Sequence, residues 1–274
     1  MLTILWILLA LLLLYVLAIL PRLPRRDIGE LKSWDYAHRG LWNAQRPENS
    51  LSAFQAAVEG GFGIELDVHL TADGQLVVHH DDSLKRMCGL DQKVAQTTLK
   101  EIRSLRLLDT DELVPTFDEV LEAVAGRVPL MVEIKVEKGN HAPLCAAVYE
   151  RMQRYHGLWC MESFQPQAVQ WFRTNAPEVI RGQLAFNHVG QGKGWQGKLL
   201  NIGIASLLQN LLSRPDFVSY EAKSEKWYSL PMRVMRLARP WLSAWTVRSQ
   251  KDMDALRKKY DIQIFEGFVP RKHR

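Results

Sequence analysis

The sequence predicts an α/β fold in which eight parallel strands, alternating with helices, close into a barrel behind one transmembrane helix. Three observations lead to this expectation. The chain opens with an uncharged stretch from Leu2 to Leu20. About 245 residues remain after it, the usual size of one (β/α)8 or TIM barrel. Along that remainder, short β-rich runs alternate with helical patterns, as in a parallel sheet with crossover helices.

We interpret the opening stretch as a membrane anchor. As a helix it would be roughly 28 Å long, about the thickness of one hydrocarbon core. A secretory signal peptide is the alternative, but it requires a basic start and a small-x-small cleavage site, and we find neither. We therefore expect an uncleaved, single-pass anchor over residues 1–21.

The segment after the anchor is basic and contains proline. Arg22, Arg25, Arg26 and Lys32 follow the anchor directly, whereas its N-terminal side carries only the α-amino group. By the positive-inside rule, this asymmetry places the rest of the chain in the cytoplasm. Pro21 and Pro24 end the helix and stiffen a linker over residues 22–33. The barrel domain is then expected over residues 34–274.

The barrel strands follow from runs rich in β-branched and apolar residues. We expect them at 35–40, 63–71, 129–135, 158–164, 179–185, 217–222, 241–247 and 262–269. Helical spacing of apolar residues predicts helices at 49–61, 116–125, 142–155, 165–175, 229–238 and 249–260. Thr116 and Glu119 form the capping box of the second of these. A small insertion after the second strand is expected over residues 83–114.

Asp73 and Gly74 lie between two apolar alternations, which is a strong hairpin signal. If these two residues form the loop, Asp67 lies directly opposite His80. Opposed residues share one face of the sheet, so a carboxylate and an imidazole would project side by side. Glu65, two residues from Asp67, would lie on the same face. The hairpin could thus assemble a metal site with an adjacent acid or base.

The overall charge is mildly positive, with 35 basic and 30 acidic residues and a net charge of +5. Such an excess suits anionic lipid surfaces or phosphate substrates, and we expect no nucleic-acid partner. The three cysteines, Cys88, Cys145 and Cys160, form no C-x-x-C pair, and an odd count is a poor disulfide framework. Reduced, buried thiols are expected, which favours a cytosolic environment.

Six short motifs resemble, in order and spacing, those of the glycerophosphodiester phosphodiesterase family. They are His38-Arg39-Gly40, Pro47-Glu48-Asn49-Ser50, Glu65-x-Asp67, His80-Asp81, Pro115-Thr116 and Glu133-Ile134-Lys135. The similarity extends from about residue 35 to residue 270. The resemblance implies a metal-dependent hydrolase that cleaves a glycerophosphodiester to glycerol 3-phosphate and an alcohol.

Three carboxylates could hold a hard divalent cation, Mg²⁺ or Ca²⁺, because oxygen ligands are what such ions prefer. Glu65, Asp67 and Glu133 lie at or near the C-terminal ends of expected strands, the face where active sites of this fold gather. The resemblance implies that they are the metal ligands. The alternative for Glu65 and Asp67, an exposed strand face, conflicts with their apolar neighbours.

His38 and His80 match the two histidines that the family uses as general acid and base. For a lone histidine we would favour a core role, but two of them beside motif residues favour catalysis. His69, on the strand face of Asp67, is a weaker candidate, and His79 and His188 are interpreted as structural or surface residues.

Substrate contacts are expected from Arg39 and Lys135, which could hold the phosphate, or could form salt bridges with the carboxylates. The resemblance adds Glu48, which could instead be a helix-start charge, and Trp245, which could wall the glycerol pocket or belong to the core.

The anchor suggests a lipid-derived substrate such as a lysophospholipid, with membrane lipid as a further partner. Two other functions remain open. One is a membrane phospholipase, C- or D-like, that acts on intact or lyso-phospholipids, and the other is a catalytically silent membrane scaffold. Residues 187–203 are rich in glycine and lysine, residues 204–212 are strongly apolar, and residues 227–241 mix apolar side chains with arginines. We interpret them as core-facing barrel helices, with a second membrane-contacting face as the alternative.

Overall fold

The computed structural model describes residues 2–271, so the first residue of the expected anchor and the last three of the expected barrel domain lie outside it. Eight parallel strands form a barrel in the order β1-β9-β8-β7-β6-β5-β4-β2, closed by pairing of β1 with β2. The expected (β/α)8 barrel is confirmed. The barrel strands are β1 (Asp35–His38), β2 (Gly63–Leu70), β4 (Leu130–Ile134), β5 (Trp159–Ser163), β6 (Arg181–Ala185), β7 (Phe217–Glu221), β8 (Trp241–Val247) and β9 (Ile262–Phe265).

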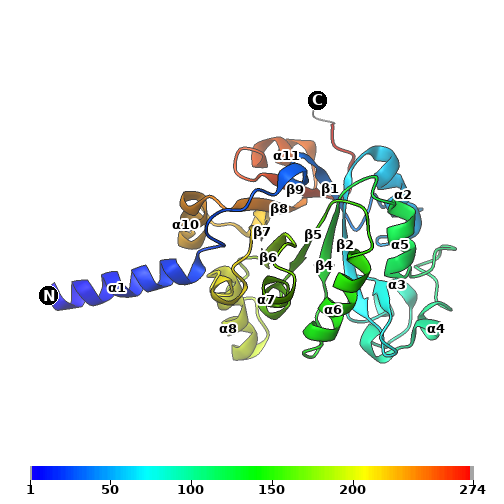
Figure 1. Cartoon of the computed structure of the whole chain (residues 1–274), viewed down its shortest axis with the longest axis horizontal. Helices are drawn as coiled ribbons and strands as arrows, with labels where there is room; N and C mark the ends of the chain where they lie inside the picture. Colours follow the sequence, from blue (N-terminus) through cyan, green and yellow to red (C-terminus); the bar gives the residue numbers. More distant parts are fainter. Residues whose placement is uncertain (1, 272–274) are drawn as a thin grey trace.

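Helices surround the barrel, and one long helix projects from it (Figure 1). The covering helices are α2 (Leu51–Gly60), α5 (Phe117–Val124), α6 (His141–Met152), α7 (Pro166–Asn175), α8 (Gly194–Ala205), α9 (Asn210–Ser213), α10 (Leu230–Ala238) and α11 (Gln250–Leu256). Short 3-10 turns η1 (Gly29–Ser33) and η3 (Ala222–Ser224) lie in the connections. No helix bounds were expected for the glycine-rich α8, and the interpretation of its segment as core-facing is wrong, because Trp195, Leu199 and Leu200 are exposed.

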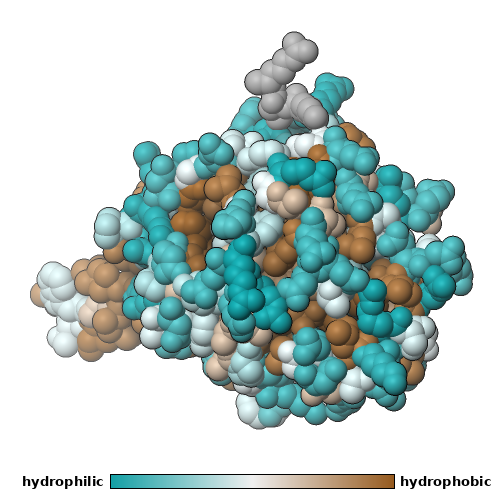
Figure 2. All heavy atoms as spheres, turned by 45° about the vertical axis from the view of Figure 1, so that its right-hand side comes forward, coloured by the Kyte–Doolittle hydropathy of each residue, from teal (hydrophilic) through white to brown (hydrophobic). Residues whose placement is uncertain are grey.

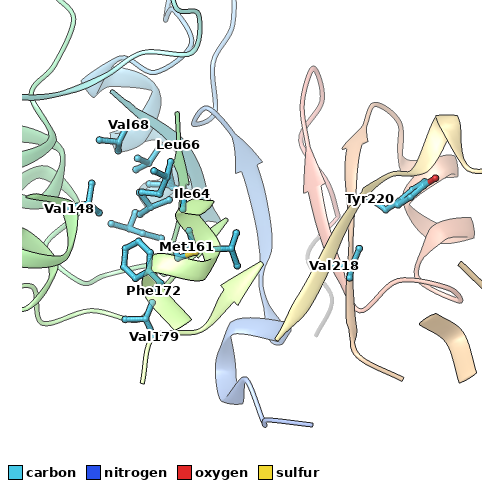
Figure 3. Close-up of a cluster of buried hydrophobic side chains, with 14 of the residues drawn as sticks. Ile64, Leu66, Val68, Val148, Met161, Phe172, Val179, Val218 and Tyr220 are labelled. Atoms are coloured by element: carbon cyan, nitrogen blue, oxygen red, sulfur yellow. The ribbon is translucent and has the colours of Figure 1, made fainter. Parts of the chain in front are cut away.

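The barrel strands present alternate residues to the helices and to the barrel interior. In β2, the side chains of Ile64, Leu66 and Val68 pack outward with Val148 of α6 and Phe172 of α7 in the main hydrophobic core (Figure 3). The intervening positions of β2 therefore point inward. This alternation puts the acidic residues of β2 inside the barrel, where burial makes an unpaired charge costly.

The N-terminal end of the barrel is filled by apolar side chains. Tyr36, Phe217 and Ile264 form a second buried cluster there, and Ile28 and Leu31 of the linker pack onto it. The hydroxyl of Tyr36 donates to the backbone oxygen of Leu31 at 2.9 Å. The linker thus packs as part of the barrel. The polar side chains of the barrel interior lie at the opposite, C-terminal end.

The hairpin of β2 and β3 (Leu76–Val78) has a different register from the expected one. Val68 pairs with Val78, and the amide of His79 donates to the carbonyl of Asp67 at 3.0 Å, so His79 rather than His80 lies opposite Asp67. The expectation was wrong by one residue because the loop has three residues, with Gly74 at φ 75° closing it.

The expected insertion after the second strand is a small subdomain with its own core. It contains α3 (Lys85–Cys88), η2 (Val94–Gln96) and α4 (Leu99–Ile102), and Leu84, Val94, Ile102 and Leu107 are buried within it. All three cysteines are free, as expected; Cys145 and Cys160 are buried, whereas Cys88 is only half-buried.

The N-terminal helix α1 (Leu2–Ile19) is long and apolar enough to cross a membrane by length and composition. It extends away from the barrel as a largely hydrophobic projection (Figures 1 and 2). Only its end contacts the barrel: Ile19 is buried, and the Tyr15 hydroxyl donates to the carbonyl of Ser206 at 2.9 Å.

Candidate active site

Strand register brings four acidic residues to the C-terminal end of the barrel. Asp67 of β2 pairs with Glu133 of β4, which pairs in turn with Glu162 of β5, and His38 of β1 pairs with Glu65. All four carboxylates are buried. Because neighbouring strands lie about 4.8 Å apart, this register alone forces the side chains into one cluster.

Glu65, Asp67 and Glu133 form a group whose ligand oxygens all lie within 4.8 Å of one another. Lys135 Nζ lies 2.9 Å from Asp67 Oδ1 and 2.8 Å from Glu133 Oε1, and the Nδ2 of Asn49 donates to Asp67 Oδ2 at 2.8 Å. Lys135 therefore does form the salt bridges considered as its alternative role.

The charge balance of this group fits a bound cation. Burial raises the pKa of Glu133 to about 7, against the pull of Lys135. Burial and the negative charges of Asp67 and Glu133 raise the pKa of Glu65 well above its ordinary value. Burial would also raise the pKa of Asp67, but Lys135, His80 and Arg39 hold it well below. The raised pKa values of Glu65 and Glu133 indicate that Lys135 and Arg39 only partly compensate three ionised carboxylates. A hard divalent ion on these three oxygen donors would supply the missing positive charge.

The turn after β1 shapes one wall of the site. Arg39 and Gly40 both have positive φ, and a Cβ at Gly40 would lie 2.9 Å from a backbone carbon of Ala53, which excludes larger residues. Asn49 also has positive φ, and its amide donates to the carbonyl of Arg39 at 2.9 Å. The Arg39 amide in turn donates to Glu65 Oε2 at 3.0 Å. Backbone strain of this kind is typical of functional sites.

His38 is oriented by an acid from the last strand segment. Its Nδ1 lies 2.5 Å from Glu266 Oε2, so that Nδ1–H donates to the carboxylate, and its Nε2 lies 3.9 Å from Glu65 Oε2. Burial lowers the pKa of His38, while Glu266 opposes that shift. The free Nε2 therefore faces the carboxylate group.

His80 is oriented by a different acid. Its Nδ1 lies 2.7 Å from Asp81 Oδ1, and the Nε of Arg86 donates to the other Asp81 oxygen at 2.6 Å. Burial, with the positive charges of Lys135 and Arg39, lowers the pKa of His80 to about 4, although Asp67 opposes the shift. The imidazole is then neutral at physiological pH, with its Nε2 able to accept a proton.

Glu48 connects the two basic residues of this wall. Arg39 donates to Glu48 Oε1 at 2.7 Å, and Arg86 of the insertion donates to the same oxygen at 2.6 Å. Glu48 is therefore a bridge between the barrel and the insertion, a more specific arrangement than the helix-start charge considered above.

A cavity of ≈ 530 Å³ opens above the carboxylates. It is also lined by Phe164, Phe186 and Trp245, and the ring centroids of Phe164 and Trp245 are 5.7 Å apart. The Trp245 indole N–H donates to the carbonyl of Ser219 at 3.1 Å, which fixes the ring. The lining of the cavity thus combines charged residues with an aromatic cluster.

His188 also lines this cavity, although the sequence suggested only a surface or structural role. Its Nε2 lies 2.6 Å from Glu221 Oε2, and its ring stacks on Phe186 with centroids 4.6 Å apart. His69 instead belongs to a separate buried group, where its Nδ1 lies 3.3 Å from Glu137 Oε1.

All nine residues expected at the site converge on this end of the barrel. The structure adds Glu162, Glu266 and Arg86, which the motifs did not identify. Glu162 and Glu266 lie at the C-terminal ends of β5 and β9. Acidic residues at the ends of expected strands could have been identified from the sequence as candidates for the site. Arg86 lies in the insertion, where the sequence has no clear helical or strand periodicity from which the orientation of its side chain could be predicted.

The comparisons with known proteins agree on one family. The model of the Glycerophosphoryl diester phosphodiesterase family matches residues 38–260. A glycerophosphodiester phosphodiesterase of Bacillus altitudinis is 37% identical over 193 residues, covering 66% of this chain and 69% of the relative. Glycerophosphodiester phosphodiesterase 1 of Mus musculus is 29% identical over 191 residues, covering 62% of this chain. That match spans 56% of the mouse protein, so the chain covers little more than half of this relative.

Solved structures share the fold over most of the chain. A phosphodiesterase of Oleispira antarctica, in complex with the product sn-glycerol-3-phosphate, has a TM-score of 0.70 at 23% identity and covers 85% of this chain and 92% of its own. A glycerophosphodiester phosphodiesterase of Thermotoga maritima has a TM-score of 0.65 at 27% identity, covering 84% of this chain and 92% of its own.

Proposed function

We propose, from the premise that this chain belongs to the glycerophosphoryl diester phosphodiesterase family, that it is a metal-dependent enzyme that hydrolyses glycerophosphodiesters to glycerol 3-phosphate and an alcohol. The observation that carries the proposal is the convergence of three buried carboxylates and two oriented histidines on one cavity. The Oleispira antarctica phosphodiesterase, bound to sn-glycerol-3-phosphate, supports the choice of product.

Glu65, Asp67 and Glu133 are proposed to hold the cation, Mg²⁺ or Ca²⁺, in the group described above. When bound, such an ion offsets the charge of the phosphate and promotes ionisation of the attacking oxygen. Lys135 and Arg39 add positive charge beside it, Lys135 as a point charge and Arg39 as a planar fork. Glu48 keeps the fork of Arg39 in place.

The proton transfers are assigned to the two histidines. His80 is neutral and has a free Nε2, because Asp81 occupies its Nδ1, so it is suited to accept the proton of the nucleophile. His38 has a free Nε2 as well; burial lowers its pKa, but the Glu266 carboxylate opposes that shift, so we assign to His38 the donation of a proton to the departing alkoxide. The two residues exchange roles if the reaction proceeds through a second step.

The aromatic cluster of the cavity is proposed to bind the uncharged part of the substrate. Trp245 and Phe164 offer a flat apolar wall for the glycerol carbon chain or for the alcohol. Choline is the leaving alcohol both in glycerophosphocholine and in lysophosphatidylcholine, but the second substrate would leave acylated glycerol 3-phosphate, which is the product expected for the phospholipase alternative.

We also propose that α1 is a single-pass membrane anchor and that the barrel domain, residues 34–274, lies in the cytoplasm. The length and composition of α1 and the arginines after it support this topology. A label attached near the C-terminus that reacts with an external reagent in intact cells would contradict the cytoplasmic side.

The test is release of glycerol 3-phosphate from glycerophosphocholine by the full chain in detergent. We expect release that stops when a chelator removes divalent ions and returns with Mg²⁺ or Ca²⁺. His80→Ala should lower kcat by roughly 10²–10⁴-fold, because it removes the proposed base. His156→Ala, at an exposed histidine, is the matched control and should leave kcat unchanged.

Chelator-resistant release would contradict the metal proposal, and unchanged kcat in His80→Ala would contradict the histidine assignment. Release of choline from lysophosphatidylcholine in vesicles, with no release of glycerol 3-phosphate from any soluble diester, would favour the phospholipase alternative.

A further inference from the structure

Exposed apolar side chains are concentrated on one part of the barrel. Among the described residues after the linker, fifteen large apolar side chains are exposed, and twelve of these lie between Val189 and Leu237. Trp195 in α8 is 73% exposed, Trp227 before α10 is 83% exposed, and Leu237 in α10 is 84% exposed. Soluble surfaces rarely gather so many large apolar groups, so this face needs a partner.

The charges on the same segment have one sign. Six basic residues between positions 189 and 239 are exposed, including Lys198, Lys226 and Arg233. The three acidic residues of that range are buried or half-buried and paired with bases, as Glu225 is with Arg236 at 2.5 Å. Aromatic, aliphatic and basic groups together match the region of lipid head groups.

Both α8 and α10 follow segments at the rim of the cavity; α8 ends at the root of α1, and α10 ends beside the linker. The loop before α8 carries Phe186, which lines the cavity, and α8 ends beside Ser206, which accepts a hydrogen bond from Tyr15. The turn before α10 carries Lys223, which also lines the cavity. Just after α10, the Trp241 indole N–H donates to the carbonyl of Arg26 at 2.9 Å.

The root of α1 is fixed to this face without a flexible spacer. Asn210 Nδ2 donates to the carbonyl of Ile19 at 2.8 Å, and Arg214 donates to the carbonyls of Leu17 and Leu20. Residues 2–14 of the described helix form a continuous exposed stretch that projects from this attachment. Because these hydrogen bonds leave no free spacer between α1 and the barrel, insertion of α1 into a membrane would hold the barrel surface around its root close to the bilayer.

We propose that the α8–α10 face, meaning the exposed apolar and basic residues between Val189 and Arg239, docks on the surface of a bilayer that contains anionic lipid. Its aromatic residues enter the interface and its lysines and arginines contact the head groups. Since α8 and α10 both follow segments at the cavity rim, docking brings the cavity mouth to the level of the head groups. Resting on the proposed function, this makes diesters that carry a lipid chain, presented by the membrane, the favoured substrates.

Depth-dependent quenching tests the docking directly. The full chain, with Cys88→Ser to leave only buried native thiols, receives one cysteine at a time: Trp195→Cys, Trp227→Cys or Leu237→Cys. Leu108→Cys and Leu158→Cys, at exposed apolar sites outside the face, are matched controls. Each protein is labelled with an environment-sensitive fluorophore and reconstituted into phosphatidylcholine–phosphatidylglycerol vesicles with brominated acyl chains.

Labels at 195, 227 and 237 should lose most of their emission to the brominated lipid, whereas those at 108 and 158 should keep theirs. The triple variant Lys198→Glu, Lys226→Glu and Arg233→Glu should reduce the quenching. Equal quenching at all five positions would overturn the proposal. Crosslinking between faces of two chains, with no lipid quenching, would also overturn it and assign the face to a dimer.

Activity separates this proposal from the proposed function. The triple variant should release glycerol 3-phosphate from soluble glycerophosphocholine at the wild-type rate but act several-fold more slowly on lysophospholipid in anionic vesicles. An equal rate on the vesicles would overturn the substrate inference. Quenching at the three face positions in a protein inactive on every diester would support docking while the proposed function fails.

Discussion

The pKa of Glu162, a single buried residue, reflects the concentration of acidic groups at the site. It is almost fully buried beside Glu133, and one of its oxygens has no hydrogen-bond partner. Burial and the charge of Glu133 raise the pKa of Glu162 to about 8. The carboxyl therefore holds a proton in the folded protein at neutral pH, which lets it act as a hydrogen-bond donor that a motif search does not reveal.

This raised pKa predicts a pH-dependent stability. Between about pH 4.5 and pH 8 the unfolded chain has lost the Glu162 proton while the folded chain keeps it, so stability falls as pH rises through that window. Glu162→Gln removes the titration. In metal-free protein, the loss of thermal stability from pH 5 to pH 8 should be smaller in the variant, by on the order of a few kcal/mol.

Thermal unfolding followed by circular dichroism at both pH values measures the effect. Glu59→Gln, an exposed glutamate of α2, is the matched control and should follow the wild type. A Glu162→Gln profile parallel to that of the wild type would show that the residue is already ionised in the folded state.

At the scale of elements, the β2–β3 hairpin shows where sequence reasoning succeeded and where it failed. Alternation correctly predicted both strands and the turn at Asp73-Gly74, but not the loop length, and so the register was off by one. His80 still reaches the cavity because β3 ends at Val78, and beyond that point pleat alternation no longer dictates direction. His80 thus lies beside the carboxylates, as expected, although the register from which this was argued was wrong by one residue.

Gly74 gives a prediction at this scale. It has φ 75° and no heavy atom within 4 Å of an added Cβ, so Gly74→Ala meets backbone strain without a clash. The cost should be about 1 kcal/mol, or a Tm lower by roughly 2–4 °C. Gly203→Ala is the matched control: its Cβ also meets open space but φ is helical, so Tm should rise slightly. Equal shifts in both variants would contradict the conformational argument.

At the scale of the whole molecule, the barrel was predictable because strand and helix patterns alternate along the chain. Helix α8 was missed because its glycines weaken the helical signal, and its exposed apolar side chains form no clear amphipathic stripe. Partners of the histidines were missed as well. Glu266 is 228 residues from His38, and only the closed barrel brings them together.

Metal binding should stabilise the whole fold. The proposed cation would bind only where Glu65, Asp67 and Glu133 are assembled, so adding Mg²⁺ or Ca²⁺ to chelated protein at about a hundred times its Kd should contribute roughly 2.7 kcal/mol. For a chain of this length Tm should rise by roughly 5–10 °C. Differential scanning calorimetry measures the shift, and Asp67→Asn should abolish it. A rise of equal size in that variant would place the ion elsewhere.

The packing of the linker beneath the barrel has a practical consequence for any shortened form of the protein. Ile28 and Leu31 close the apolar end of the barrel, and Arg26 and Trp241 join the linker to β8. A protein begun at Trp34 would expose that apolar end to water and tend to aggregate for reasons unrelated to the membrane. A truncated protein that begins at Arg22 lacks the hydrophobic helix but keeps the linker residues that cover the apolar end of the barrel.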